Sequence, residues 1–194
     1  MSTLKTTNLQ HPSAASPAIV LDADGNATVA GMGLVHINTT TITSATAVSL
    51  DSVFTSSYRN YLIVYDLVAS TTANPTLRLR LSGTDNTASE YDQQYILSSS
   101  STVVAGASNA QTSWGIAAVG DRLYTTATID IFRPNLAAPT LLQASSGQSN
   151  INGGSSGNRT TTGSHRASTS FDGFTVAFST ATGSLSVYGY SNGA

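Results

Sequence analysis

A serine between glycines is the first feature of this sequence that could do chemistry. Residues 153–157 read GGSSG, which fits the G-x-S-x-G pattern around the nucleophilic serine of many hydrolases, and a Ser155–His165–Asp172 triad can be written. That pattern requires a strand before the serine and a helix after it. Here the flanking sequences, QSNIN and NRTTTGSH, are typical of a polar loop. We therefore interpret the motif as a chance match in a Gly/Ser tract.

A second motif looks like the start of a calcium-binding loop. Residues 22–26 read DADGN, with Asp22, Asp24 and Asn26 at alternate positions. An EF-hand loop needs a glutamate at its twelfth position, and that position here is Gly33. Asp-Gly and Gly-Asn are strong turn dipeptides, so a plain hairpin turn is the better interpretation.

Histidines and carboxylates form no recognisable site either. The three histidines, His11, His36 and His165, lack metal-ligand spacing. Paired carboxylates such as Glu90 with Asp92, or Asp121 with Asp130, could serve glycoside hydrolysis, but ten acidic residues in 194 give such pairs by chance. We expect no catalytic residue, no cofactor and no metal ion, and therefore no enzyme.

Aromatic residues beside polar ones are the strongest candidates for ligand contact. A flat aromatic ring with a hydrogen-bonding rim suits a glycan or a protein receptor, whereas the same rings also pack at sheet edges and in oligomer interfaces. Both interpretations stay open. The candidate receptor or glycan contacts are Tyr91, Tyr95, Trp114 and Tyr124.

Composition excludes several classes of partner. Only 9% of the 194 residues are charged, the net charge is −2, and Lys5 is the only lysine, so we expect no nucleic-acid binding. No apolar run is long enough to insert in a membrane, and the N-terminus lacks the apolar core of a signal peptide. There is no cysteine. The apolar fraction of 40% favours a folded, Ser/Thr-rich all-β protein over a disordered chain.

Period-two alternation predicts about eight strands in an antiparallel, jelly-roll-like β-sandwich over residues 34–194. In TLRLRL, Leu77, Leu79 and Leu81 are expected to point inward. Residues 61–68 are apolar on both faces apart from Asp66, so the second face is expected to meet another protomer or a flanking segment. Residues 98–111 are expected to be mainly loop, and residues 145–170 a long polar loop. The candidate interface residues are Tyr61, Ile63 and Tyr65.

Residues 1–33 are predicted to form an extended N-terminal arm. Pro12 and Pro17 prevent a regular helix, and two short strands, 18–21 and 27–30, flank the DADGN turn. A lone hairpin is marginal in water, so we expect the arm to bind another protein. The candidate anchoring residues are Pro12, Pro17, Ile19 and Leu21.

Three stretches of the sequence have a recognisable pattern: LKTTNLQHPSAASPAIVLDADGNATVAG near the start, FTSSYRNYLIVYDLVASTTANPTLRLRLSGTDNTASEYDQQYI in the middle, and FDGFTVAFSTATGSLSVYGYSNGA at the end. Together they resemble segments of bacteriophage tail-fibre and minor tail proteins. The resemblance implies a virion protein, typically a homotrimer, docked on other virion proteins through residues 1–33. It also implies attachment to a host-surface glycan or protein.

Three other functions compete with a tail fibre or tail tip. A capsid decoration or head-fibre protein would use the same sandwich and arm on the phage shell. A polysaccharide-cleaving tailspike is disfavoured because no repeat appears, and a host lectin is disfavoured because no signal peptide appears. We expect a structural protein made in the host cytoplasm and located in the virion, at the tail rather than the capsid.

Overall fold

The computed structural model consists of β-strands, turns and connecting segments, with no helix among the residues it describes, and the predicted all-β class is confirmed. The described residues form fourteen strands, and the pairings among these strands are antiparallel. The described residues are 8–9, 12, 19–21, 27–29, 33–70, 74–99, 101–117, 124–149 and 156–191.

A small sheet near the N-terminus contains β1 (Asn8–Leu9), β2 (Ile19–Leu21) and β3 (Ala27–Val29) in that order. Ile19 pairs with Val29, which confirms the predicted hairpin. Ile19 is half-buried, and Pro12 is exposed in a turn. Pro17 and the DADGN turn lie outside the described residues. That residues 1–33 anchor the chain stays a prediction.

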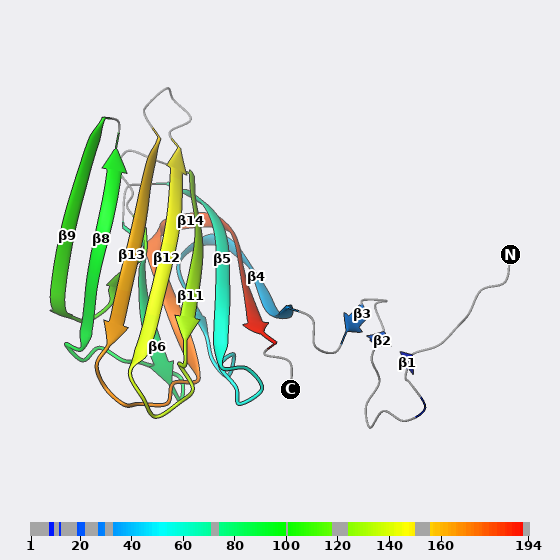
Figure 1. Cartoon of the computed structure of the whole chain (residues 1–194). Coiled ribbons are helices and arrows are strands. Elements are labelled where there is room, and N and C mark those ends of the chain that lie inside the picture. Colours follow the sequence, from blue (N-terminus) through cyan, green and yellow to red (C-terminus); the bar gives the residue numbers. More distant parts are fainter. Residues whose placement is uncertain are drawn as a thin grey trace, which may run out of the picture.

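The main sheet has eleven strands and is curled (Figure 1). Its order is β10-β6-β14-β5-β11-β12-β13-β8-β9, with β4 paired to β14 and β7 paired to β6. Its strands are β4 (Leu34–Leu50), β5 (Asn60–Ala69), β6 (Thr76–Leu81), β7 (Thr84–Asp85), β8 (Tyr91–Ser99), β9 (Thr102–Gln111), β10 (Trp114–Gly115), β11 (Tyr124–Phe132), β12 (Thr140–Ser149), β13 (Gly157–His165) and β14 (Gly173–Tyr190).

Strand β14 explains the curl. Its first part, residues 173–177, pairs with β6, and residues 181–189 pair with β5, while β4 pairs along both parts. The register shifts at Ala181 and Gly183, and such bulges bend a strand and increase its twist. Gly183 has a φ of 157°, and a Cβ there would collide with the carbonyl oxygen of Asp66. The close approach of β5 to this bend therefore requires glycine.

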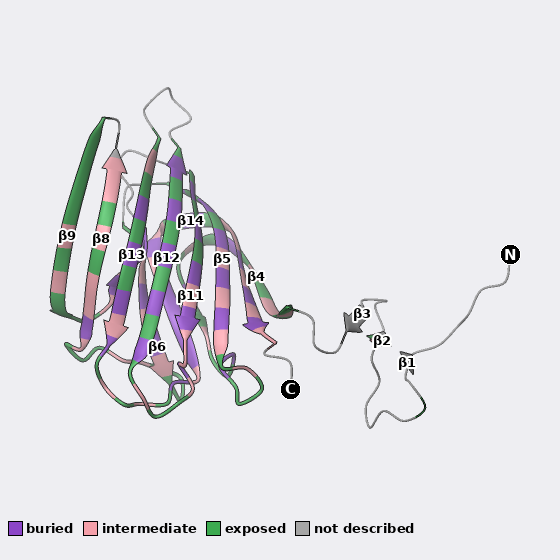
Figure 2. Cartoon of the chain, viewed as in Figure 1, coloured by how far each residue is buried: buried purple, intermediate pink, exposed green. Residues whose placement is uncertain are grey.

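The hydrophobic core lies on the inner face of the curled sheet, and burial alternates along its strands (Figure 2). Leu77 and Leu79 are fully buried, as their spacing predicts, whereas Leu81 is 45% exposed and its predicted inward position is wrong. Leu81 is the last residue of β6 and pairs with Thr84 across a tight turn, so it lies beyond the covered part of the sheet.

The predicted protomer interface on β5 is wrong for its named residues. Tyr61 and Ile63 are 0% exposed and Tyr65 is 1% exposed, all within this chain's own core. The rings of Tyr61 and Phe54 pack with centroids 4.7 Å apart, so this inner face of β5 is covered by the core of the same chain. Its outer face carries Leu62 and Val64, which are half-buried.

Two predicted loops are strands. Residues 102–111 form β9, and of the residues predicted as the second loop, 145–149 end β12 and 157–165 form β13. Arg159, Thr161 and His165 alternate with exposed or half-buried neighbours along β13. Both faces of this strand carry polar residues, and this composition favoured a loop. The segment is nevertheless a strand because it pairs with β12 on one side and β8 on the other.

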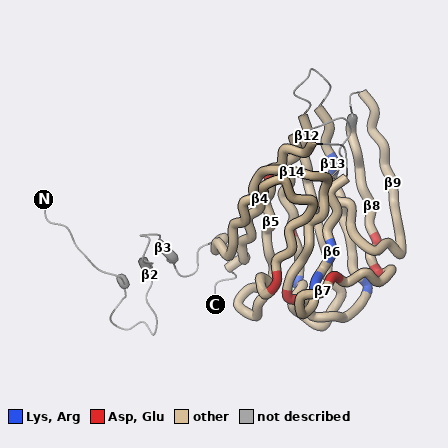
Figure 3. Tube along the Cα trace, turned by 180° about the vertical axis from the view of Figure 1, so that it is seen from behind, with Lys and Arg blue, Asp and Glu red and all other residues tan. Residues whose placement is uncertain are grey.

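Charged residues are few on this sheet and gather mainly at the end that carries β7 (Figure 3). There Arg80 bonds to Asp51 at 2.7 Å and to Asp85 at 2.5 Å, and also to the carbonyl oxygen of Gly83. The exposed side chains along the middle of β8, β11, β12 and β13 are uncharged.

Candidate functional site

The outer face of the sheet carries a broad array of exposed, uncharged polar side chains. It spans β8, β11, β12 and β13, where the inward neighbours in each strand are buried or half-buried. We call this surface the hydroxyl face, and its members are Gln94, Thr126, Thr128, Gln143, Ser145, Asn158, Thr160 and Thr162.

Strand pairing arranges these side chains in rows. Neighbouring strands are about 4.8 Å apart, and residues on one face repeat about every 7 Å along a strand. Hydroxyl and amide groups therefore form a regular grid on a backbone held by ladder hydrogen bonds. One row runs Thr128, Ser145, Thr160 and Ile96, and the next runs Asp130, Gln143, Thr162 and Gln94.

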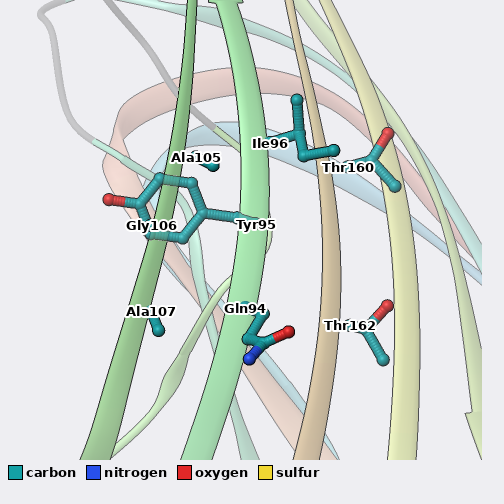
Figure 4. A pocket seen from close by; sticks show the side chains of 8 residues that line it. All are labelled: Gln94, Tyr95, Ile96, Ala105, Gly106, Ala107, Thr160 and Thr162. Atoms are coloured by element: carbon teal, nitrogen blue, oxygen red, sulfur yellow. The ribbon is translucent and has the colours of Figure 1, made fainter.

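A groove of about 570 Å³ crosses one side of the hydroxyl face. Figure 4 shows Ile96 beside Thr160 and Gln94 beside Thr162, in the order that the register gives. Ile96 is 55% exposed and supplies an apolar contact among the polar groups. Volumes of this size are typical of sites for small ligands. The groove is lined by Gln94, Tyr95, Ile96, Ala105, Gly106, Ala107, Thr160 and Thr162.

The carboxylates at the border of the hydroxyl face already have partners. Asp130 accepts a hydrogen bond from the Tyr190 hydroxyl, and burial together with Asp130 raises the pKa of Tyr190 to about 12. Asp92 lies 3.2 Å from Arg166 Nε and accepts a bond from the Ala110 amide. A ligand on the hydroxyl face would therefore be held by neutral hydrogen bonds.

Two of the four candidate aromatic contacts are buried, and the prediction for them is wrong. Trp114 and Tyr91 are both 0% exposed and pack edge-to-face with ring centroids 4.9 Å apart. Trp114 Nε1 donates to the carbonyl oxygens of Asp92 and Ser164, at 3.1 and 3.3 Å. The polar residues next to Tyr91 and Trp114 in sequence point to the opposite face of each strand. Polar neighbours in sequence therefore did not indicate that these two rings are exposed.

The other two candidates differ from each other. Tyr124 is 43% exposed and pairs with Val68, which is 41% exposed, so the two form an apolar patch at one end of the outer face. Tyr95 is half-buried, lies against Gly106 of β9, and has the Arg159 guanidinium 4.0 Å from its ring centroid. Tyr124 keeps the geometry of a surface contact, whereas Tyr95 packs toward the interior.

The residues of the possible triad and carboxylate pairs have other contacts. His165 is fully buried among Tyr91, Trp114 and Phe171, with Glu90 at 3.6 Å. Asp172 accepts a bond from the Ser82 amide. Ser155 and Asp121 lie outside the described residues. Across the described ranges, His, Asp and Glu form no group of three that could hold a metal ion.

The hydroxyl face was not predicted from the sequence, although three of its strands carry a recognisable pattern. YTTATIDIF, TLLQASSGQS and GNRTTTGSH each alternate exposed polar residues with buried ones. Alternation does not give the order of strands in a sheet. It therefore could not predict that these three strands lie next to one another.

Comparison with protein-family models, curated proteins and solved structures gave no match for this chain. Within the described residues, no helix has the length and apolar character needed to cross a membrane.

Proposed function

We propose that this chain is a non-enzymatic structural protein of a bacteriophage virion, a tail-fibre or tail-tip component that contributes to host attachment. The observation that carries the attachment role is the hydroxyl face. Its hydroxyl and amide groups both donate and accept hydrogen bonds, which matches the hydroxyl-rich surface of a host glycan. Because the groups lie on paired strands, they are held in place before a ligand binds.

The groove at β8, β9 and β13 suits a sugar ring. Gln94, Thr160 and Thr162 are exposed around it, and Ile96 offers an apolar surface to the ring's C–H groups. At the other end of the outer face, Tyr124 beside Val68 gives a second apolar contact. Sites of this kind combine apolar walls with a few polar groups that fix orientation.

Docking on the virion is the proposed role of residues 1–33. Strands of two or three residues are too short to be stable alone, so β1, β2 and β3 suit addition to the sheet edge of another virion protein. In this proposal the curled sheet is a jelly-roll-like sandwich module, and the protein is a homotrimer. The half-buried Leu62 and Val64 on the outer side of β5 are available for contact between copies.

Competition for adsorption tests the attachment role. Host cells are incubated with the purified chain and then with phage, and free phage is counted over time. The wild-type chain is expected to slow adsorption, and Thr160→Arg to lose this effect because a long cation fills the groove. Thr87→Arg, at an exposed position in the loop before β8, is the matched control and should compete like wild type. Equal competition by Thr160→Arg, with an unchanged Tm, would contradict the proposal.

A further inference from the structure

A second hollow adjoins the groove on the hydroxyl face. It measures about 260 Å³ and is lined by residues of β11, β12 and β13, whereas the groove is lined by residues of β13, β8 and β9. Thr160 and Thr162 of β13 line both. Because the hollow and the groove share these two residues, they meet over β13 and form one depression, which we call the trough.

Two cross-strand rows of side chains border the trough from end to end. One row consists of Thr128, Ser145, Thr160, Ile96 and Ala105. The next row consists of Asp130, Gln143, Thr162, Gln94 and Ala107. Every residue of both rows lines the groove, the second hollow or both, and Figure 4 shows the part of each row on β13, β8 and β9. The trough therefore runs between the two rows, across the strands, from β11 to β9.

The trough has the length and width of one extended chain. Four strand spacings separate β11 from β9, about 19 Å in all, and the two rows are about 7 Å apart. This length holds about four sugar rings in line, one for each strand spacing. Side chains of both rows recur at every strand that such a chain would cross, so each sugar ring meets a similar set of contacts.

The charges along the trough favour an uncharged ligand. Among the described residues that line it, Asp130 is the one carboxylate and none is Lys or Arg. Asp130 is half-buried and accepts a hydrogen bond from the Tyr190 hydroxyl. An acidic ligand would approach this carboxylate without a basic partner, which is unfavourable. Neutral hydroxyl groups can instead exchange hydrogen bonds with Gln143 and with the threonines of β13.

The two ends of the trough differ in polarity. The β11 end carries hydroxyl, amide and carboxylate groups, whereas the β9 end carries Ile96, Ala105 and Ala107. Burial of apolar surface adds to hydrogen bonding at the β9 end. A short ligand is therefore expected to occupy that end first, and a longer one to extend from there toward β11.

We propose that the ligand of the hydroxyl face is a linear, uncharged oligosaccharide segment of about four sugar units that lies in the trough, across the strands. This inference rests on the proposed attachment function and specifies its ligand. The paired strands hold the side chains of both rows at fixed spacing, so a longer segment meets more of them. Affinity therefore increases with length until the trough is filled.

Host-surface oligosaccharides of graded length test this proposal. Polysaccharide from the host envelope is partly hydrolysed, separated into neutral and acidic fractions and sorted by length. Each fraction is labelled at its reducing end with an uncharged fluorophore and titrated with the purified full chain, and binding is read by fluorescence anisotropy. The affinity for neutral fractions should rise about tenfold between two and four units and then level off. Affinity independent of length, tighter binding of acidic fractions, or binding to no fraction would overturn the proposal.

Variants locate the ligand. Thr128→Arg places a long cation in the β11 end of the trough and should remove the gain in affinity beyond two units, while the affinity for the disaccharide stays within about twofold of wild type. Thr126→Arg is the matched control, because Thr126 is exposed on the same face of β11 but lies one row outside the trough. It should keep the full gain. If Thr128→Arg does not fold, Ser145→Arg, the next position of the same row, replaces it. A full gain in the folded variant would overturn the placement.

Failure of this inference can be told apart from failure of the attachment role. If the chain slows phage adsorption but binds no neutral oligosaccharide, the attachment role stands and the proposed ligand is wrong. If the chain neither slows adsorption nor binds any fraction, both proposals fail.

Discussion

The hydroxyl of Tyr91 on β8 accepts a hydrogen bond from the backbone N–H of Leu79 on β6 at 3.0 Å. These strands are far apart in the order of the sheet, and the curl brings β6 over the inner face of β8. The same hydroxyl donates to the carbonyl oxygen of Asn86 at 3.0 Å. Burial raises the pKa of Tyr91 to about 12, so the phenol keeps its proton for this second bond. One buried side chain thus satisfies two backbone groups.

Tyr91→Phe should therefore destabilise the fold. The ring would still pack against Trp114 and His165, but the Leu79 N–H would lose its partner in a fully buried place. The expected loss in the free energy of unfolding is about 1–3 kcal/mol, measured by urea denaturation. Tyr124→Phe, at an exposed tyrosine, should stay within about 0.5 kcal/mol of wild type. Equal effects of the two substitutions would show that the Leu79 bond does not matter.

Gly163 on β13 makes room for Trp114. A Cβ at this position would lie 2.6 Å from Trp114 Nε1 and 2.7 Å from its Cδ1. Gly163→Ala should displace the indole and lower the free energy of unfolding by about 1–3 kcal/mol. Gly147→Ala on β12 is the control, because its Cβ would meet only Thr126 Oγ1 at 3.6 Å. A Tm of Gly163→Ala above that of Gly147→Ala would contradict the packing described.

Arg80 joins three segments at the lower end of the sheet. It bonds to Asp51, to Asp85 and to Thr175 Oγ1, and its side chain is 12% exposed. Arg80→Met should lower the free energy of unfolding by about 1.5–3 kcal/mol, the range for hydrogen bonds to charged groups. Arg166→Met removes an exposed pair with Asp92 and should cost less than about 1 kcal/mol. Chemical denaturation of both variants checks this, and a larger loss for Arg166→Met would refute the ranking.

His165 makes the fold sensitive to mild acid. Burial lowers the pKa of His165 below its ordinary value of 6.5, although Glu90 acts in the opposite direction. As the pH falls below about 6.5, the unfolded chain therefore binds a proton at this position before the folded chain does. The free energy of unfolding should fall in that window, down to the folded-state pKa, by at most about 1.4 kcal/mol per pH unit.

Urea denaturation at several pH values checks this effect. The loss in the free energy of unfolding between pH 7.5 and pH 5.5 should be smaller in His165→Phe than in wild type. Between pH 7.5 and pH 8.5 His165 is neutral in both states, so it should contribute no change there. Identical pH profiles for the two proteins would show that His165 does not titrate differently on folding.

Local patterns predicted much of the fold. The alternation in TLRLRL placed Leu77 and Leu79 in the core, and the turn residues at 22–26 predicted the pairing of Ile19 with Val29. Both inferences depend on residues close together in sequence. In such cases backbone periodicity alone decides which side chains share a face.

Long-range pairing could not be read from the sequence. Trp114 belongs to a strand of two residues, and it is buried because β10 packs on β8 and β13, twenty or more residues away. Strand β13 is polar on both faces, and only its neighbours β12 and β8 make it a strand. The hydroxyl face depends on the same long-range pairings, so the set of residues that form it could not be predicted from the sequence.

The location of the chain on the phage particle tests most directly the claim that it is a tail protein. Particles would be labelled with gold through an antibody against this chain and imaged by electron microscopy. Gold at the tail end is the predicted result, and it would justify a search for the host receptor. Gold spread over the shell would contradict the tail location and support a capsid decoration or head-fibre protein. Particles without any gold would contradict a structural role in the virion altogether.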